Sequence, residues 1–186
     1  MRIISGKLRK RLLVSFDSER IRPTSDRAKE SIYSTLNSIL IKKNKSFSDL
    51  VILDGFCGSG SLGIEAISRG SKKVFFIDIS NAALKLARQN CENLEVTKCA
   101  TFLNYDLTNF KTKHPIEADL FFLDPPYGKF DIEKILQAIK KNNMIKEKSI
   151  GVIEVSSNQK KDSFFGFKTI NKKKISKSFF LFLENE

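Results

Sequence analysis

From residue 50 onward, short apolar runs alternate with stretches in which apolar residues recur every three or four positions. The apolar runs predict buried strands at 50–53, 74–77, 100–103, 118–123 and 150–153. The stretches between them predict helices at 61–69, 81–91 and about 132–139. Strands that alternate with helices are typical of a parallel α/β sheet. Two strand-like runs, about 167–175 and 178–183, have no helix between them and predict a final antiparallel hairpin.

The chain before residue 50 follows a different pattern. Arg2–Ile4 and Leu12–Val14 predict two short strands joined by a turn. Thr24 or Ser25 is a candidate N-cap for the helix that follows. One face of that helix carries Ala28, Ile32, Leu36, Ile39 and Leu40.

The length of 186 residues fits one domain, and 41% hydrophobic residues suit a globular core. We divide the chain into a basic β-hairpin extension, residues 1–24, and a main domain, residues 25–186. No apolar run approaches the roughly 18 residues that span a bilayer, and Met1–Lys7 lacks the apolar region of a signal peptide. We therefore expect a cytoplasmic protein without membrane contact. The 3 cysteines and 1 histidine indicate neither a disulfide framework nor a metal site.

The net charge of +12 is high for this length, and its distribution is uneven. A first cluster comprises Arg2, Lys7, Arg9, Lys10 and Arg11. A second comprises Lys160, Lys161, Lys168, Lys172, Lys173, Lys174 and Lys177. Such clusters bind phosphate backbones through counterion release, which indicates a nucleic-acid partner. The alternative for either cluster is a merely solvated basic surface.

Four acids stand at the ends of four successive predicted strands of the alternating part: Asp54, Asp78, Asp106 and Asp124. In a parallel sheet these ends share one edge, where ligands of such folds bind. Converging carboxylates repel one another unless a ligand compensates their charge. An ammonium, a sulfonium and a sugar would compensate, whereas the two phosphates of a dinucleotide would not. The pattern therefore favours S-adenosylmethionine over NAD as the ligand.

The segment Asp54–Gly60 joins a predicted strand to a predicted helix, and its glycines let the backbone approach a ligand closely. Asp78 can accept hydrogen bonds from both hydroxyls of a ribose. Asp106 stands where an acceptor can meet an adenine amino group. Each acid taken alone could simply be a polar strand end, so the prediction depends on the set.

Asp124-Pro125-Pro126-Tyr127 follows the apolar run Ala118–Leu123. The prolines fix φ and lack N–H donors, so the turn is stiff and presents its carbonyl groups. Asp124 adds an acceptor and Tyr127 adds a flat ring. This combination can hold a planar amine such as the exocyclic amino group of a base. The alternative is a proline-rich turn that closes a strand.

These motifs together resemble the RsmD family, the guanine-N2 methyltransferases of bacterial small-subunit ribosomal RNA. The matching blocks are Arg2–Lys7, Arg22-Pro23-Thr24 with Asp26, Arg27 and Glu30, Gly58–Ala66 with Ser68-Arg69-Gly70, and Asp124–Tyr127. The resemblance implies a Rossmann-like class I methyltransferase with a mostly parallel seven-stranded sheet whose last strand is antiparallel, plus a small N-terminal β-hairpin and helix. It also implies a monomer that methylates a specific guanine of 16S rRNA within the assembled or assembling 30S subunit. The sequence departs from the family pattern at Gly55 and Cys57, which could loosen cofactor binding, and at Asp78, where a Glu is usual and the Asp has a shorter reach to the ribose with the same chemistry.

The resemblance assigns roles to individual residues. Cofactor binding falls to Asp54, Gly55, Phe56, Gly58, Ser59, Gly60, Asp78, Ile79, Asp106, Leu107 and Thr24. Catalysis falls to Asp124, Pro125, Pro126 and Tyr127, with Asp124 and the Pro125 carbonyl accepting from guanine N2 and Tyr127 stacking on the base. RNA binding falls to Arg2, Lys7, Arg9, Lys10, Arg11 and Arg22, and no metal is expected.

Two other functions remain open at this point. A DNA adenine-N6 or cytosine-N4 methyltransferase is compatible with D-P-P-Y, although such enzymes generally carry a target-recognition region for which this chain has little room. A non-catalytic RNA-binding assembly factor could also use a methyltransferase fold.

Overall fold

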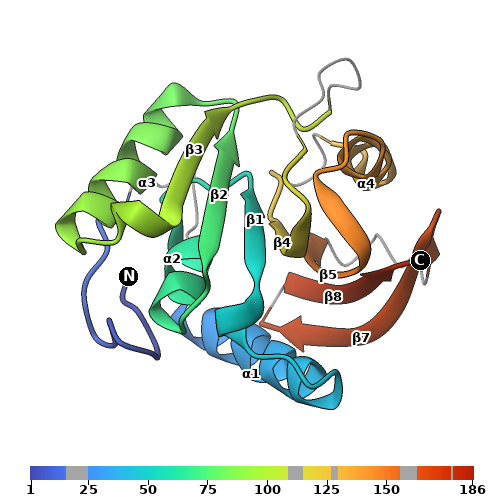
Figure 1. Cartoon of the computed structure of the whole chain (residues 1–186), viewed down its shortest axis with the longest axis horizontal. Coiled ribbons are helices and arrows are strands. Elements are labelled where there is room, and N and C mark those ends of the chain that lie inside the picture. The colour runs from blue at the N-terminus through green and yellow to red at the C-terminus, as the bar shows by residue number, and fades with distance from the viewer. Residues whose placement is uncertain (16–24, 109–114, 127–129, 156–162, 177) are drawn as a thin grey trace.

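The computed structural model describes residues 1–15, 25–108, 115–126, 130–155, 163–176 and 178–186. Within these ranges, eight strands form one sheet in the order β3-β2-β1-β4-β5-β8-β7-β6 (Figure 1). The parallel part comprises β1 (Val51–Gly55), β2 (Lys73–Asp78), β3 (Ala100–Asn104), β4 (Ala118–Leu123) and β5 (Ile145–Val155). The antiparallel part comprises β6 (Ser163–Phe164), β7 (Phe167–Ile175) and β8 (Ser178–Asn185).

The sheet confirms the predicted fold class, including an antiparallel last strand, since β8 runs against both β5 and β7. Two details differ from the sequence pattern. The strand β6 adds an eighth member that is only two residues long. β5 begins at Ile145, earlier than predicted, and the apolar pattern did not reveal this start because the strand's first part carries the exposed polar residues Lys146, Glu147 and Lys148.

Four α-helices and two short 3₁₀ helices complete the described part of the fold. The α-helices are α1 (Asp26–Lys42), α2 (Ser61–Ser68), α3 (Asn81–Asn93) and α4 (Ile132–Lys141). The 3₁₀ helices are η1 (Phe47–Asp49) and η2 (Thr97–Cys99). Ser25 caps α1 as predicted, because its side chain accepts a hydrogen bond from the Ala28 N–H. None of the helices in the described ranges is long and apolar enough to cross a membrane.

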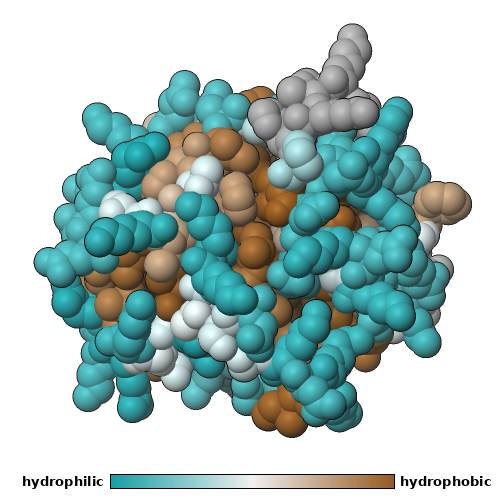
Figure 2. Space-filling view, in the orientation of Figure 1, coloured by the Kyte–Doolittle hydropathy of each residue, from teal (hydrophilic) through white to brown (hydrophobic). Residues whose placement is uncertain are grey.

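The helices divide between the two faces of the sheet, and each face has its own apolar core. Buried residues of α1, α2 and α3 pack with one set of inward-facing strand residues, which includes Ile52 and Phe122. Buried residues of α4 pack with the alternate set, which includes Leu53 and Phe121. This alternation follows from the period of two along a strand. Hydrophilic side chains cover most of the outer surface seen in Figure 2.

The N-terminal segment forms the predicted hairpin over a short stretch. An antiparallel bridge joins Arg2 to Leu12, and the N–H groups of Ile3 and Leu13 donate to the carbonyls of Arg11 and Met1 at 3.0 Å each. The segment is also tied to α2, because the backbone N–H groups of Ile4 and Ser5 donate to the carboxylate of Glu65. Because the N–H groups of Ile4 and Ser5 serve this buried carboxylate, they do not lengthen the hairpin, which stays short.

Candidate active site

The structure brings the four predicted acids to one edge of the sheet. Asp54 belongs to β1 and Asp78 ends β2, while Asp106 and Asp124 follow β3 and β4. These strands are neighbours in the order β3-β2-β1-β4 and run parallel. All four acids therefore come from the carboxyl ends of adjacent strands, which is where α/β sheets bind ligands.

The loop between β1 and α2 owes its shape to residues with positive φ. Phe56, Gly58 and Gly60 have φ values of 58°, 52° and 76°. A side chain placed at Gly58 would meet none of the described residues within 4 Å, so within the described part of the chain open space lies beside this backbone. Gly63, by contrast, packs α2 on the sheet, since an added Cβ would lie 2.4 Å from the ring of Phe76. The loop can thus receive a ligand at Gly58 while its helix stays close to the strands.

The glycines do not by themselves choose between cofactors. Gly58, Gly60 and Gly63 have the spacing G-x-G-x-x-G, which dinucleotide-binding folds also use. The preference for a cationic ligand depends on the acids around the loop.

Asp54 is the one of these four acids that is fully buried. Its side chain is buried, with 2% of the residue exposed, and it accepts a 2.8 Å hydrogen bond from the Gly63 N–H. Burial raises the pKa of Asp54 from 3.8 to about 7, the Gly63 N–H partly opposes this rise, and the charge of Asp78 adds to it. Because burial disfavours the charged form of Asp54, an ammonium group of a ligand beside it would stabilise the carboxylate and lower its pKa.

Asp78 connects the loop to the start of α3. One carboxylate oxygen accepts from the Gly58 N–H at 3.1 Å, and the other accepts from the Ser80 N–H at 2.9 Å. Each oxygen retains a lone pair for a further donor such as a ribose hydroxyl. Ile79 beside it is 64% exposed, an apolar surface that a flat ring could cover.

Asn104, at the end of β3, was not singled out by the sequence pattern. Its amide donates to the backbone carbonyls of Asp78 at 3.1 Å and Ile79 at 2.8 Å. It therefore fixes the backbone that presents the predicted ribose and adenine contacts. A single polar residue after an apolar run gives no signal of this role, because its acceptors are backbone groups of another strand.

Asp106 and Leu107 lie next to this region. The Asp106 carboxylate accepts from the Thr108 N–H at 2.9 Å and from the Thr108 hydroxyl at 2.7 Å, which makes a local turn. Leu107 is buried, and a Cβ at Gly55 would lie 2.6 Å from its side chain. The glycine at position 55 thus lets the chain after β3 approach β1.

The D-P-P turn begins directly after β4. Asp124 is half-buried, Pro125 is buried and Pro126 is exposed. Tyr127, to which a stacking role was assigned, lies outside the described residues, as do Thr24 and Arg22. Phe130, a few residues later, packs against Phe56 with ring centroids 5.1 Å apart. This pair, which sequence reasoning missed, joins the cofactor loop to the segment after the turn.

The basic residues predicted to bind RNA have different surroundings. Lys7, Arg9, Lys10 and Arg11 are exposed. Arg2 is exposed but forms a 2.9 Å ion pair with Asp26, so part of its charge is already neutralised. In the second cluster, Lys168, Lys172, Lys173 and Lys174 lie on β7, while Lys160, Lys161 and Lys177 lie outside the described residues.

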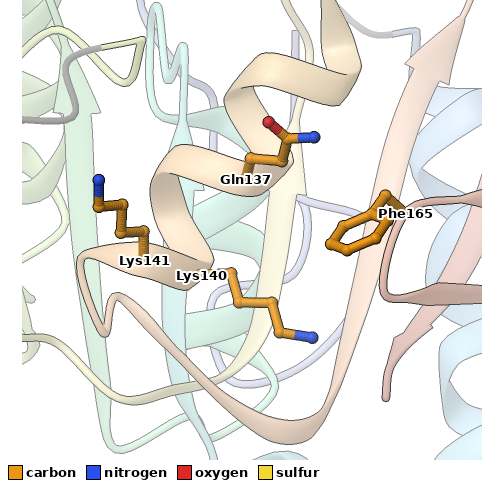
Figure 3. A pocket seen from close by; sticks show the side chains of 4 residues that line it. All are labelled: Gln137, Lys140, Lys141 and Phe165. Carbon is orange, nitrogen blue, oxygen red and sulfur yellow. The ribbon is translucent and has the colours of Figure 1, made fainter.

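A hollow of about 460 Å³ lies away from the four acids, between α4 and the turn that joins β6 to β7 (Figure 3). Its lining residues are Gln137, Lys140, Lys141 and Phe165. The Lys140 ammonium donates to the main-chain oxygen of Glu186 at 2.8 Å. Glu186 follows directly after β8, and the carboxyl end of β8 pairs with the middle of β5 near Ile150. Of the predicted site residues that the structure describes, none lines this hollow.

Comparison with known proteins agrees with this geometry. The family described as Conserved hypothetical protein 95 matches residues 1–184. A Haemophilus influenzae protein named ribosomal RNA small subunit methyltransferase D is 33% identical over 165 residues, covering 86% of this chain and 80% of its own. This chain belongs to the RsmD family. The family indicated by the sequence motifs is therefore confirmed.

Two solved structures place the RsmD-family chain among proteins of the same fold. The Escherichia coli protein yhhF has a TM-score of 0.85 at 24% identity, with coverage of 100% of this chain and 98% of its own. An RNA methyltransferase from Salinibacter ruber, solved in complex with S-adenosyl-L-homocysteine, has a TM-score of 0.65 at 16% identity, with coverage of 88% and 94%. At these identities the likeness concerns the fold.

Proposed function

We propose that the protein transfers the methyl group of S-adenosylmethionine to the exocyclic N2 amine of a guanine in small-subunit ribosomal RNA. The substrate would be the assembled or assembling 30S subunit, and the protein would act as a cytoplasmic monomer. The observation that carries the proposal is the placing of Asp54, Asp78, Asp106 and Asp124 on adjacent strand ends beside an open glycine loop. The name of the Haemophilus influenzae relative supports ribosomal RNA as the substrate.

The residues present fit the cofactor in three respects. Burial raises the pKa of Asp54 to about 7, so an ammonium group bound beside the loop would stabilise its carboxylate. The carboxylate of Asp78 retains lone pairs for ribose hydroxyls, and the exposed Ile79 offers an apolar surface for adenine. The complex of the Salinibacter ruber protein with S-adenosyl-L-homocysteine supports the same choice. When bound, this cofactor supplies an electrophilic methyl group.

The chain's own part in the reaction would be to orient the amine. An exocyclic amine is a poor nucleophile because its lone pair is delocalised into the ring. Asp124 and the main-chain carbonyl of Pro125 would accept from the two N–H groups and turn the lone pair toward the methyl group. The amine held by these two acceptors would take the methyl group as the cofactor's sulfur gives it up, and the methylated amine would then release a proton.

Positioning would supply much of the rate, since effective molarities of well-oriented reactants reach roughly 10⁵ M or more. No strong base is needed before transfer, because the methylated amine is acidic while it carries the extra proton. A base within a helix would first have to be unstacked, at a cost of a few kcal/mol.

The test compares three substrates with labelled S-adenosylmethionine: isolated 30S subunits, free 16S rRNA and duplex DNA. We expect label in ribosomal RNA, and N2-methylguanosine as the product by mass spectrometry of nucleosides. Label in duplex DNA as N6-methyladenine or N4-methylcytosine would refute the proposal in favour of a DNA enzyme. Absence of cofactor binding by calorimetry would refute it in favour of a non-catalytic RNA-binding factor.

Asp124→Ala tests the assigned residue. We expect this variant to lose turnover while its affinity for S-adenosyl-L-homocysteine stays within about twofold of the wild type, because the aspartate would contact the base. Glu147→Ala serves as the matched control, since Glu147 is an exposed acid near the start of β5. Full activity of Asp124→Ala would overturn the assignment.

A further inference from the structure

Asn90 is a buried polar residue of α3 that none of the roles above explains. It is 1% exposed, and its side-chain amide donates to the backbone carbonyls of Ser59 at 3.0 Å and Val14 at 2.9 Å. Its side-chain oxygen accepts from the Val14 N–H at 2.8 Å. Both donors and the acceptor of one side chain are thus satisfied by two backbone segments. One segment is the glycine loop and the other belongs to the basic N-terminal region.

The N-terminal strap, residues 1–15, is held firmly at its other end. The buried carboxylate of Glu65 accepts from the N–H groups of Ile4 at 2.8 Å and Ser5 at 3.0 Å. Ser68 donates from its hydroxyl to the Ser5 carbonyl at 2.6 Å. Gly6 lies so close that an added Cβ would be 1.9 Å from the Ser68 carbonyl oxygen. The strap is therefore docked on α2, the helix that begins where the glycine loop ends.

The strap also carries the exposed basic residues Lys7, Arg9, Lys10 and Arg11. Between Gly58 and Gly60, the Ser59 carbonyl is joined to the strap through one amide group, that of Asn90. A shift of the loop on ligand binding would alter three hydrogen bonds that share this amide. Its effect would extend to the backbone of Val14, which the same amide holds by both its N–H and its carbonyl group.

We propose that Asn90 is a positioning residue that couples the occupancy of the glycine loop to the placement of the basic strap. Cofactor binding then favours the strap arrangement that binds RNA, and RNA binding favours the loop arrangement that binds cofactor, by the same factor in both directions. This inference rests on the proposed function for the identity of the two ligands. The link between loop and strap is a separate property and can be measured without RNA.

Three variants separate the parts of this network. Asn90→Leu keeps the branched shape and the number of side-chain heavy atoms and removes all three hydrogen bonds. Asn90→Asp keeps an acceptor for the Val14 N–H but sets a second oxygen against the two carbonyls, so it breaks the connection to Ser59 while retaining one bond to the strap. Asn93→Leu is the matched control, because Asn93 is an exposed residue of the same helix.

The first experiment follows the Val14 amide by ¹⁵N NMR during titration with S-adenosyl-L-homocysteine. In the wild type and in Asn93→Leu, we expect the Val14 signal to shift and its hydrogen exchange to slow as the loop is occupied. Both Asn90 variants should lose this response although the loop still binds the ligand. A silent Val14 amide in the liganded wild type, or an unchanged response in both Asn90 variants, would overturn the inference without touching the proposed function.

The second experiment measures the affinity for isolated 30S subunits with and without saturating S-adenosyl-L-homocysteine. We expect the ligand to tighten binding by about fivefold or more in the wild type and in Asn93→Leu, and to leave it nearly unchanged in the Asn90 variants. A merely structural role would weaken binding but preserve the ratio, and that result would overturn the inference. If the wild type binds 30S subunits with no effect of the ligand, the coupling to RNA is wrong. If it binds and methylates no ribosomal RNA, the proposed function itself fails.

Discussion

The carboxylate of Asp54 should make the protein less stable at higher pH. Its pKa in the native state is about 7, against an ordinary value of 3.8, because burial disfavours the charged form. Between these two values the native state binds more protons than the unfolded state. The contribution of this group to the free energy of unfolding therefore falls as the pH rises through that window. Asp54→Asn removes the titration while its amide oxygen can still accept from Gly63.

The size of the effect follows from the two pKa values. The free energy of unfolding of Asp54→Asn minus that of the wild type should increase by about 2.5 kcal/mol as the pH is raised from 5 to 8. Every other titrating group is common to both proteins and largely cancels in the comparison. The same substitution should lower the affinity for S-adenosyl-L-homocysteine by tenfold or more, about 1.4 kcal/mol, because an amide cannot neutralise an ammonium group.

The assay is urea denaturation of both proteins without cofactor at pH 5, 6, 7 and 8, followed by circular dichroism. A ¹³C NMR titration of the Asp54 carboxyl group provides the pKa directly. A difference in stability that is the same at pH 5 and pH 8 would refute the reasoning. So would a titration midpoint near 4, since both results would mean that burial does not penalise this charge.

Two further predictions concern the strap. Gly6→Ala should lower the free energy of unfolding by about 2 kcal/mol or more in urea denaturation, because Gly6 has a φ of 86° and the added Cβ would overlap the Ser68 carbonyl. A decrease in this free energy of less than about 0.5 kcal/mol would show that the strap is not docked as described. Replacing Arg9 and Lys10 with alanine should weaken RNA binding to a similar extent for all sequences. The slope of log affinity against log salt should decrease in magnitude by about 0.7 to 0.9 for each phosphate that the variant no longer neutralises. An unchanged slope in filter-binding measurements would show that neither residue belongs to the RNA interface.

Much of the sheet was predictable because its parallel strands are buried on both faces. Continuous runs such as 120–123 and 74–77 carry this signal directly. The acids at the strand ends were predictable for the same reason, since the end of an apolar run marks the edge of the sheet. β6 was missed because two residues make no pattern. The predicted N-terminal hairpin is present but shorter than the two apolar pieces suggest, because the N–H groups of Ile4 and Ser5 bond to Glu65.

The missed functional residues share one cause. The side-chain amides of Asn104 and Asn90 donate hydrogen bonds to backbone carbonyls that lie far away in the sequence, and the ring of Phe130 packs against the ring of Phe56. Their partners are defined by tertiary folding and not by local spacing. The roles assigned to Tyr127, Thr24 and Arg22 stay predictions, because these residues lie outside the described part of the chain.

The position of β8 has a consequence for how the chain is made. β8 lies between β5 and β7, so the strand synthesised after both of them fills the gap that separates them. Until residues 178–185 leave the ribosome, the apolar strand β5 presents an unpaired edge. Unpaired apolar edges recruit strands from other chains. A nascent or prematurely terminated chain should therefore aggregate or be degraded, and the enzyme's abundance should depend on chaperones that shield β5 during synthesis.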